Sequence, residues 1–306
     1  MSPPRRPRGA AHARKHAPRR ITAALLRGWP LPDPGEGESK EDRGRVLAIG
    51  GSAQVPGAVL LAGLAALRAG AGKLQVGTAA TAALPLAIAM PEAKVMGLPA
   101  TRAGAIRELG REAAEAARSA GAVLVGPGMD RSAATRRVAT AVLAAACCPV
   151  VLDAGALDPA VVPALRRRAR AGGATILTPH AGEMAGLLGI EERAIAADAQ
   201  SIARDHAQAW GVVLALKGPT THVAAPDGRA WVNTAGCAGL GTSGSGDVLA
   251  GIVAGLVARG ADAAQAATWG VYLHARAGAR LSRRLGLVGF LAREIGDEIP
   301  ALLRTL

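Results

Sequence analysis

Short runs of apolar residues recur along the chain, and most are followed by small residues and then by a longer segment rich in Ala, Leu and Arg with helical spacing. Continuous apolar runs of about five residues are typical of parallel strands that helices cover on both faces. The pattern therefore predicts one layered α/β domain. We expect its parallel strands at residues 45–49, 72–76, 122–125, 150–152, 174–177 and 212–216.

Two further stretches need a different interpretation. Residues 222–225 and 229–232 flank a Pro-Asp-Gly turn, which predicts a hairpin and so an antiparallel edge on the mostly parallel sheet. Residues 74–91 carry no charge, but a glycine and two prolines interrupt them. This favours a buried strand and loop over a membrane span, so we expect no membrane segment.

The composition is consistent with such a domain. A chain of 306 residues, 50% of them hydrophobic, can bury a large core. Because only 2% are aromatic and 40 are glycine, that core must be built from Ala, Val, Leu and Ile with closely approaching backbones. Cys147, Cys148 and Cys237 lack metal-ligand spacing and indicate no disulfide framework. We therefore expect a cytoplasmic protein in a reducing compartment.

The net charge of +13 is concentrated at the N-terminus. Residues 1–20 hold seven Arg or Lys and no acid, which leaves +6 for the rest of the chain. We expect residues 1–20 to be a disordered basic tail, 21–43 a linker and lead-in, and 44–306 the folded domain. The tail lacks the apolar core of a secretory signal. No basic, aromatic-rich face follows it, so we expect no nucleic-acid partner.

The segment most informative about chemistry is the glycine-rich stretch NTAGCAGLGTSGSGDVL, residues 233–249, which runs into an apolar helical pattern. Unpaired N–H groups at a helix N-terminus, together with the helix dipole, bind anions, and glycines let a phosphate come close. We expect an anion hole at Gly244, Ser245 and Gly246. The spacing fits neither a P-loop, whose Lys-Ser/Thr pair is absent, nor the Rossmann pattern at a first strand.

Asp247 lies just inside this helix start and has two interpretations. It could cap the helix, or it could accept a proton from a hydroxyl while the anion hole holds the phosphoryl group that the hydroxyl attacks. The glycine cluster beside it favours the catalytic role.

GTSGSGD at residues 241–247 resembles the glycine-rich catalytic loop of the ribokinase-like superfamily, in which the closing Asp is the base. Five further stretches resemble, in order and spacing, the NAD(P)H-hydrate dehydratase branch of that superfamily, and the resemblance covers about residues 44–303. These stretches are GRVLAIGGSAQVPGAVLLAG from Gly44, AVLVGPGMDR from Ala122, VVLDAGAL from Val150, TPHAGEMAGLLG from Thr178 and LKGPTTHVAAPDG from Leu216.

The resemblance implies a ribokinase-like layered α/β/α fold and assigns residues to the site. It implies that Asp247 is catalytic. Substrate contacts are implied for Ala58, Gly128, His180 and Asp247, and nucleotide contacts for Lys217, Gly218, Pro219, Thr220, Thr221 and Gly246.

Several of these positions follow strands, where open α/β folds bind ligands. A lone His is more often structural, which is how we interpret His206, His222 and His274; only the resemblance makes His180 a substrate contact. Glu183 could cap a helix or serve the site, and Asp153 could stabilise a turn or position substrate or metal. The metal ligands are not identifiable from the sequence.

The implied reaction is dehydration of the S epimer of hydrated NADH or NADPH (NADHX or NADPHX). ADP would phosphorylate the hydroxyl, giving AMP, and phosphate would then leave, with Mg²⁺ neutralising charge. Relatives imply a homo-oligomer, a tetramer. Since only about 40 residues precede the first strand, a separate epimerase polypeptide is expected. The loop has Asn-Thr-Ala-Gly-Cys at 233–237 and Ser243 where relatives have Asn-Pro-Thr-Gly-Asn and glycine.

Two other functions remain open on the sequence. A ribokinase-like small-molecule kinase, acting on a thiazole or a hydroxymethylpyrimidine, would share the loop before Asp247 and would release a stable phosphorylated product. A non-catalytic nucleotide- or RNA-binding protein would explain the basic tail, but the intact Gly-Asp pair argues against it.

Overall fold

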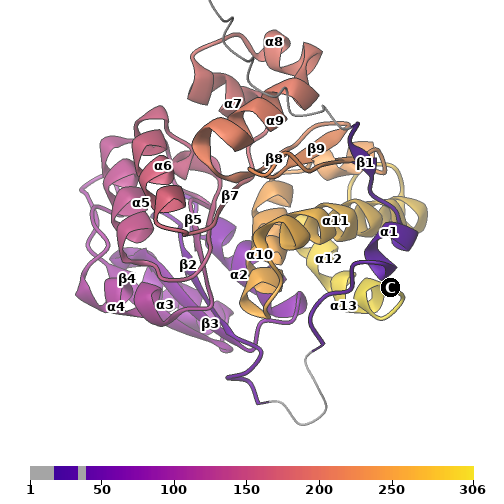
Figure 1. The fold of residues 1–306 in the computed structure, drawn as a ribbon. Coiled ribbons are helices and arrows are strands. Elements are labelled where there is room, and N and C mark those ends of the chain that lie inside the picture. The colour runs from indigo at the N-terminus through magenta and orange to yellow at the C-terminus, as the bar shows by residue number, and fades with distance from the viewer. Residues whose placement is uncertain (1–16, 34–38) are drawn as a thin grey trace, which may run out of the picture.

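The structure is a computed structural model that describes residues 17–33 and 39–306. Within these residues ten strands form one sheet in the order β1-β10-β9-β8-β7-β6-β5-β2-β3-β4 (Figure 1). The strands are β1 Arg19–Arg20, β2 Arg45–Ile49, β3 Lys73–Ala79, β4 Ala93–Leu98, β5 Ala122–Val125, β6 Val150–Leu152, β7 Thr175–Leu177, β8 Val213–Leu216, β9 Thr221–Ala224 and β10 Ala230–Asn233.

Helices cover both faces of this sheet (Figure 1). The α-helices are α1 Ala23–Arg27, α2 Gly57–Arg68, α3 Ala80–Ala89, α4 Arg111–Ser119, α5 Ala133–Ala145, α6 Val162–Arg170, α7 Ala181–Leu188, α8 Glu192–Ala197, α9 Ala199–Trp210, α10 Ser245–Ala258, α11 Ala263–Leu285, α12 Ala292–Asp297 and α13 Ile299–Leu303. Short 3₁₀ helices are η1 Ala154–Ala156, η2 Pro159–Val161 and η3 Ala238–Gly241.

The two faces of the sheet belong to two separate hydrophobic cores. Val46 and Ala48 of β2 pack into the core under α2, α10 and α11, whereas Leu47 and Ile49 pack into the core under α4 to α7 and α9. Successive side chains of a strand point to opposite faces, so a strand buried on both must be apolar throughout. This is the physical reason for the continuous apolar runs, and the layered α/β/α prediction is confirmed.

Polar caps and glycines set many helix ends. Asp262 accepts hydrogen bonds from Ala264 N and Gln265 N, both 2.9 Å long, and so begins α11. Gly189 and Gly211 end α7 and α9 in the left-handed conformation, with φ of 69° and 71°. These local signals place the loops at the strand ends.

The six expected parallel strands are confirmed, with ends that differ by no more than a few residues. The predicted hairpin is also present, since β8, β9 and β10 pair antiparallel. The hairpin is not the edge of the sheet, however. Arg19 and Arg20 of β1 pair in parallel with Trp231 and Val232 of β10.

The expected tail and linker therefore need a correction where the structure describes them. Residues 19–20 belong to the sheet, and Trp29 of the lead-in stacks on Trp231 with ring centroids 5.4 Å apart. The Nε2 of Gln265 donates to Pro30 O at 2.7 Å. The free energy gained by packing Trp29 on Trp231 outweighs the conformational entropy lost when this Pro-rich segment becomes ordered. Residues 1–16 of the expected tail lie outside the described residues.

The prediction of a loop within residues 74–91 is also wrong. Residues 80–89 form α3, with Pro85 inside it, and β4 follows as a further parallel strand that the sequence did not reveal. A proline removes one helical hydrogen bond, but here Ala and Leu side chains pack the helix against β4. None of the helices in the described ranges has the length and apolarity needed to cross a bilayer.

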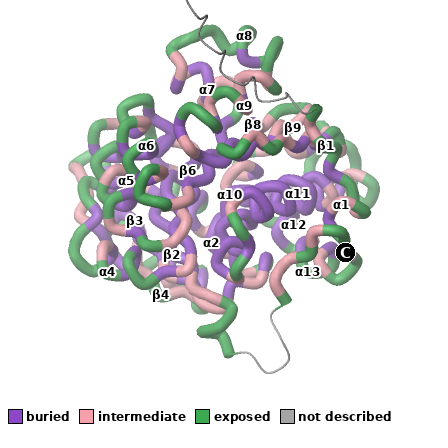
Figure 2. Tube along the Cα trace, viewed as in Figure 1, coloured by how far each residue is buried: buried purple, intermediate pink, exposed green. Residues whose placement is uncertain are grey.

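Helix α10 lies in the middle of one helical layer, and Figure 2 shows it buried along its length. It packs between α2 and α11. A Cβ on Gly251 would lie 2.1 Å from Ala62 O, and one on Gly255 would lie 2.4 Å from Ala66 O. The glycines let the backbones of α2 and α10 touch, which holds the N-terminus of α10 firmly at the sheet edge.

Candidate active site

The strand order reverses at β2, whose neighbours are β3 on one side and β5 on the other. Loops that leave β2 and β5 diverge there, and such a switch point is where open α/β sheets bind ligands. Ala58 begins α2 after β2, and Gly128 follows β5. A Cβ on Gly128 would lie 2.8 Å from Ala58 Cβ and 2.5 Å from Val55 O. The structure thus brings these two predicted substrate residues together.

The Gly-Pro-Gly loop at residues 126–128, after β5, packs closely against its neighbours. A Cβ on Gly126 would lie 1.7 Å from Asp153 O. The space beside Gly126, like that beside Gly128, is filled by neighbouring protein, so these glycines are required for packing between loops.

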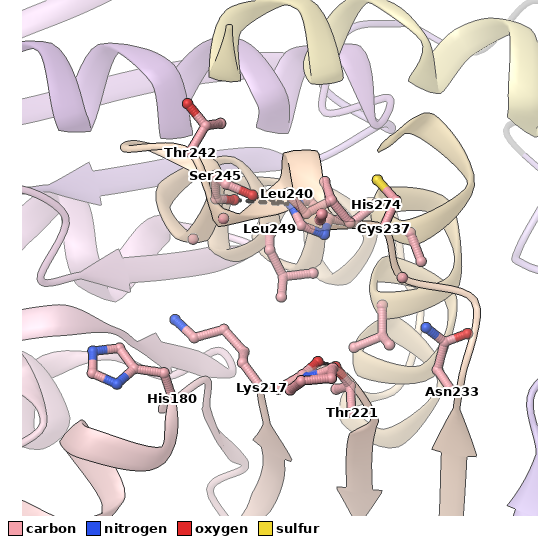
Figure 3. A pocket seen from close by; sticks show the side chains of 18 residues that line it. His180, Lys217, Thr221, Asn233, Cys237, Leu240, Thr242, Ser245, Leu249 and His274 are labelled. Carbon is pink, nitrogen blue, oxygen red and sulfur yellow. Dashed lines mark hydrogen bonds between the residues drawn. The ribbon is translucent and has the colours of Figure 1, made fainter. Parts of the chain in front are cut away.

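A second group of predicted residues lines a cavity of about 790 Å³. Figure 3 shows Lys217 and His180 on one wall, and Ser245 and His274 on the facing wall. The nucleotide and anion-hole candidates in its lining are Lys217, Gly218, Pro219, Thr221, Ser245 and Gly246, and His180 joins them. Ala58, Thr220, Gly128, Gly244 and Asp247 are not part of this lining.

The glycine-rich loop ends in a left-handed Gly244, with φ of 88°, that caps α10. The Ser245 N–H donates to Thr242 O at 3.2 Å, and the Val248 N–H donates to Gly244 O at 3.1 Å. In this fully described segment the Gly246 and Asp247 N–H groups have no protein acceptor. At the predicted anion hole the N–H groups of Gly244 and Gly246 thus lack a protein acceptor, as does that of Asp247, whereas the Ser245 N–H is already bonded within the loop.

A buried charge cluster lies next to this helix start. The Nζ of Lys217 is 3.0 Å from Asp153 Oδ1 and 3.7 Å from Glu183 Oε2. The hydroxyl of Thr178 donates to the same Asp153 oxygen at 2.7 Å. A Cβ on Gly246 would lie 3.1 Å from Lys217 Nζ, so the ammonium group adjoins the anion hole. Asp153 thus belongs to this charge cluster, and its side chain makes no capping bond.

The charges in this cluster control its ionisation. Burial disfavours the charge of Lys217, but the negative charges of Asp153, Glu183 and Asp247 outweigh it and raise the lysine pKa. Burial, followed by the charge of Asp153, raises the pKa of Asp247 to about 7, even though Lys217 acts in the opposite direction. A carboxylate with a pKa near neutral pH is suited to accept and return a proton.

Asp247 lies between the two groups of residues. A Cβ on Gly244 would lie 4.0 Å from Asp247 Oδ2 and 2.6 Å from Leu61 Cδ1, one turn along α2 from Ala58. Lys217, on the other side, acts electrostatically on Asp247. The Asp247 carboxylate therefore lies near the start of α10, with α2 close to the preceding Gly244 and with Lys217 within electrostatic reach.

Glu183 caps a helix, as one of its two interpretations predicted, and it also contacts Lys217. The Nδ1 of His180 accepts from Gly182 N at 3.0 Å, and Glu183 Oε2 accepts from His180 N at 2.7 Å, which is a capping box at the start of α7. The same carboxylate oxygen faces Lys217. The Nε2 of His180 lies 3.5 Å from Glu183 Oε1, and the His180 side chain is 58% exposed.

The sequence interpretation missed part of the cavity lining. Of the three histidines assigned a structural role, His274 lines the cavity and bonds to Ser245, whereas the Nδ1 atoms of His206 and His222 are buried without a partner. The spacing of three and four residues between Val271, His274 and Ala275 was the available signal, since it marks one face of a helix. The other lining residues not assigned to the site from the sequence are Asn233, Gly236, Cys237, Ala238, Leu240, Gly241, Thr242 and Leu249.

A doubly wound sheet with a glycine-rich loop before its last long helices is the architecture of the ribokinase-like class. A ribokinase-like superfamily protein from Enterococcus faecalis has the same fold, with a TM-score of 0.76 at 23% identity over 97% of this chain and 99% of that one. The ribokinase-like fold is thereby confirmed.

Closer relatives identify the family. A family model described as NAD(P)H-hydrate dehydratase matches residues 46–301. The chain is 52% identical over 289 residues to the ADP-dependent (S)-NAD(P)H-hydrate dehydratase of Xanthomonas campestris, which covers 94% of this chain and 97% of the relative. It belongs to the NAD(P)H-hydrate dehydratase family, as the sequence motifs predicted.

A solved structure in this family agrees. An ADP/ATP-dependent NAD(P)H-hydrate dehydratase from Bacillus subtilis, co-crystallised with ATP and Mg²⁺, matches with a TM-score of 0.79 at 29% identity. The match covers 94% of this chain and 98% of that chain. The family is one of lyases, which favours dehydration over the small-molecule kinase alternative.

Proposed function

We propose that this protein uses ADP to dehydrate the S epimer of NADHX and NADPHX, restoring NADH and NADPH and releasing AMP and phosphate. The observation that carries the proposal is the position of Asp247. The backbone N–H groups of Asp247 and Gly246 lack protein acceptors, and Lys217, which lines the cavity that we name the nucleotide cavity, acts on the Asp247 carboxylate. On the other side of Asp247, the preceding Gly244 approaches Leu61 of α2, the helix that carries Ala58. This is the arrangement that phosphoryl transfer to a bound hydroxyl requires.

Each residue has a distinct task in this reaction. Lys217 and the N–H groups of Gly246 and Asp247 hold the terminal phosphoryl group of ADP. The Asp247 carboxylate accepts the proton of the substrate hydroxyl. At the same time the hydroxyl oxygen bonds to the terminal phosphorus of ADP, and the bond between that phosphorus and AMP breaks. The carbon–oxygen bond then breaks and phosphate leaves with the electron pair of that bond. The neighbouring ring carbon gives up a proton to water, and the electron pair of that C–H bond forms the ring double bond again. Phosphate is a better leaving group than hydroxide, which is why a nucleotide is consumed.

We assign the remaining predicted contacts on their positions. Ala58, Gly128 and His180 contact the hydrated nicotinamide nucleotide at the switch point. Gly218, Pro219 and Thr221 line the nucleotide cavity. Thr220, which is outside that lining, contributes to the turn that presents these residues.

Mg²⁺ fits this site as a companion of the nucleotide. No group of three or more His, Cys, Asp or Glu in the described ranges forms a cage for a metal ion. Mg²⁺ needs only one or two protein carboxylates when substrate phosphates and water supply the other oxygens. Asp153, Glu183 and Asp247 are the oxygen donors available here. When bound, the ion neutralises charge on the transferring phosphoryl group.

The first experiment is recovery of reduced-nicotinamide absorbance from prepared NADHX, with Mg²⁺ and either ADP or ATP. Recovery with ADP is the expected result. Recovery with ATP alone would correct the donor. A stable phosphorylated product without recovery would support the small-molecule kinase instead. Asp247→Asn is the matched control and should remove turnover while the protein stays folded.

Three further proposals accompany this reaction. A dehydratase that acts on one epimer leaves the other unused, so a separate epimerase polypeptide should accompany it. A homotetramer is proposed from the family resemblance, and light scattering on the purified chain would test it. The three cysteines form no disulfide within the described residues. Free thiols are typical of the cytoplasm, which we propose as the compartment.

A further inference from the structure

His274 is a histidine of the nucleotide cavity that has no task in the reaction proposed above. It lies on α11 and faces the first residue of α10, as Figure 3 shows. Its Nε2 is 2.9 Å from Ser245 Oγ and 3.0 Å from the Ser245 carbonyl oxygen. These two contacts join α11 to the anion hole.

The bond to the carbonyl fixes the state of the imidazole. A carbonyl oxygen only accepts hydrogen bonds, so Nε2 must carry the proton and donate it. Burial, with a smaller contribution from the charge of Lys217, lowers the pKa of His274 to about 4 against the opposing effect of the Ser245 bond. The ring is therefore neutral at pH 7, with a donor at Nε2 and an acceptor at Nδ1.

The geometry of the peptide bond links the direction of the Ser245 carbonyl to that of an N–H group in the anion hole. The Ser245 carbonyl and the Gly246 N–H belong to one planar trans peptide unit, so they point in opposite directions. Orienting the carbonyl therefore orients the Gly246 N–H, which is one of the two free donors of the α10 first turn. Because Ser245 Oγ accepts from the shared Nε2–H, its own hydroxyl proton remains free to donate.

We infer that His274 is a positioning residue for the terminal phosphate of the nucleotide: through Ser245 it aims the Gly246 N–H and the Ser245 hydroxyl at that phosphate. The inference rests on the proposed function, in that it takes a nucleoside diphosphate as the ligand. This positioning role differs from that of a side chain that only shapes the cavity wall, because it affects binding of the phosphate and leaves binding of the nucleoside unchanged.

Three variants separate these roles. His274→Leu removes the donor. His274→Gln keeps an amide N–H close to the position of Nε2, whereas His274→Asn places its amide nearer the position of Nδ1 and so lacks that donor. His206→Leu is the matched control, since His206 lies on α9 outside the cavity lining, packed on Trp210 with ring centroids 4.8 Å apart.

The experiment measures the affinities of the full chain for ADP and for adenosine by calorimetry with Mg²⁺. His274→Leu should lose about tenfold or more in its preference for ADP, because a hydrogen bond to a charged group is lost, while adenosine affinity is unchanged. His274→Gln should restore most of the preference and His206→Leu should keep it. In the dehydration assay His274→Leu should raise KM for ADP and lower kcat, as loss of both ground-state and transition-state contacts predicts.

Equal weakening of ADP and adenosine would overturn the inference, as would His274→Gln behaving like His274→Leu. If His274→Leu does not fold, the comparison of His274→Gln with His274→Asn gives the same decision. A wild-type protein that binds no ADP would overturn the proposed function and this inference with it. Binding of ADP with a preference unchanged in the variants would overturn the inference alone.

Discussion

Replacing Asp247 by Asn should stabilise the folded protein while it abolishes turnover. The pKa of Asp247 rises from 3.8 to about 7, with burial as the main cause, so ionised Asp247 is disfavoured in the folded state. A rise of about 3 pKa units corresponds to about 4 kcal/mol at most, since each unit is worth about 1.4 kcal/mol. Asn carries no charge and avoids this cost, which makes the catalytic carboxylate a source of instability.

The stability difference between Asp247→Asn and the parent protein should depend on pH, in a direction set by the raised pKa of Asp247. Because the folded state holds the Asp247 proton more tightly than the unfolded state does, stability is lost as the pH rises from about 4 to about 7. The advantage of Asp247→Asn should therefore grow by about 1.4 kcal/mol per pH unit over this window and stay constant above it.

Urea unfolding of both proteins at pH 4.5, 6 and 8 measures this difference directly. The midpoint of Asp247→Asn should exceed that of the parent by an amount that increases from pH 4.5 to 8, with equal slopes against urea. Circular dichroism confirms that both begin folded. A difference that does not change with pH, or a variant less stable at pH 8, would refute the argument that burial raises the pKa of Asp247.

Three further predictions concern the same elements. Asp153→Asn removes a negative charge that raises the pKa of Asp247. The acid limb of the plot of kcat/KM against pH, expected near pH 7, should therefore move to lower pH. A shift to higher pH would contradict the assignment of that limb to Asp247. Gly251→Ala places a Cβ against the backbone of Ala62 and should lower Tm, with a cost of about 1–3 kcal/mol for overpacking. Arg168→Leu removes donors to the carbonyls that end α5 and should destabilise by about 1–3 kcal/mol, read from urea midpoints, with kcat unchanged at low temperature.

The fold was largely predictable because its strands are buried on both faces. Parallel strands under two helical layers need uninterrupted apolar runs, and the runs before the loops at 50, 126 and 153 are of that kind. Strand β4 was missed because its buried and exposed residues are mixed at the edge of the sheet. Helix α3 was missed because Pro85 is a local signal, whereas the packing that overrides it is not local.

The candidate site was predictable where it depends on loops at strand ends. Asp247, Lys217 and His180 follow from the glycine-rich stretch and the motifs after two strands, and the structure brings them to one region. The bond between His274 and Ser245 was not predictable, because the two residues are 29 positions apart on different helices. The spacing of Val271, His274 and Ala275 marks one helix face, but it gives no sign of a polar partner on another helix.

By itself the sequence determined the layered sheet, the glycine loop before α10 and the family, because periodicity and short motifs are properties of neighbouring residues. Only the tertiary structure decided which charges meet. Lys217 donates a hydrogen bond to Asp153, which is 64 positions away in the sequence. Burial, together with the negative charge of Asp153, sets the pKa of Asp247 near neutrality. Desolvation and Coulomb energies depend on distances through space, and these exist only once the chain has folded.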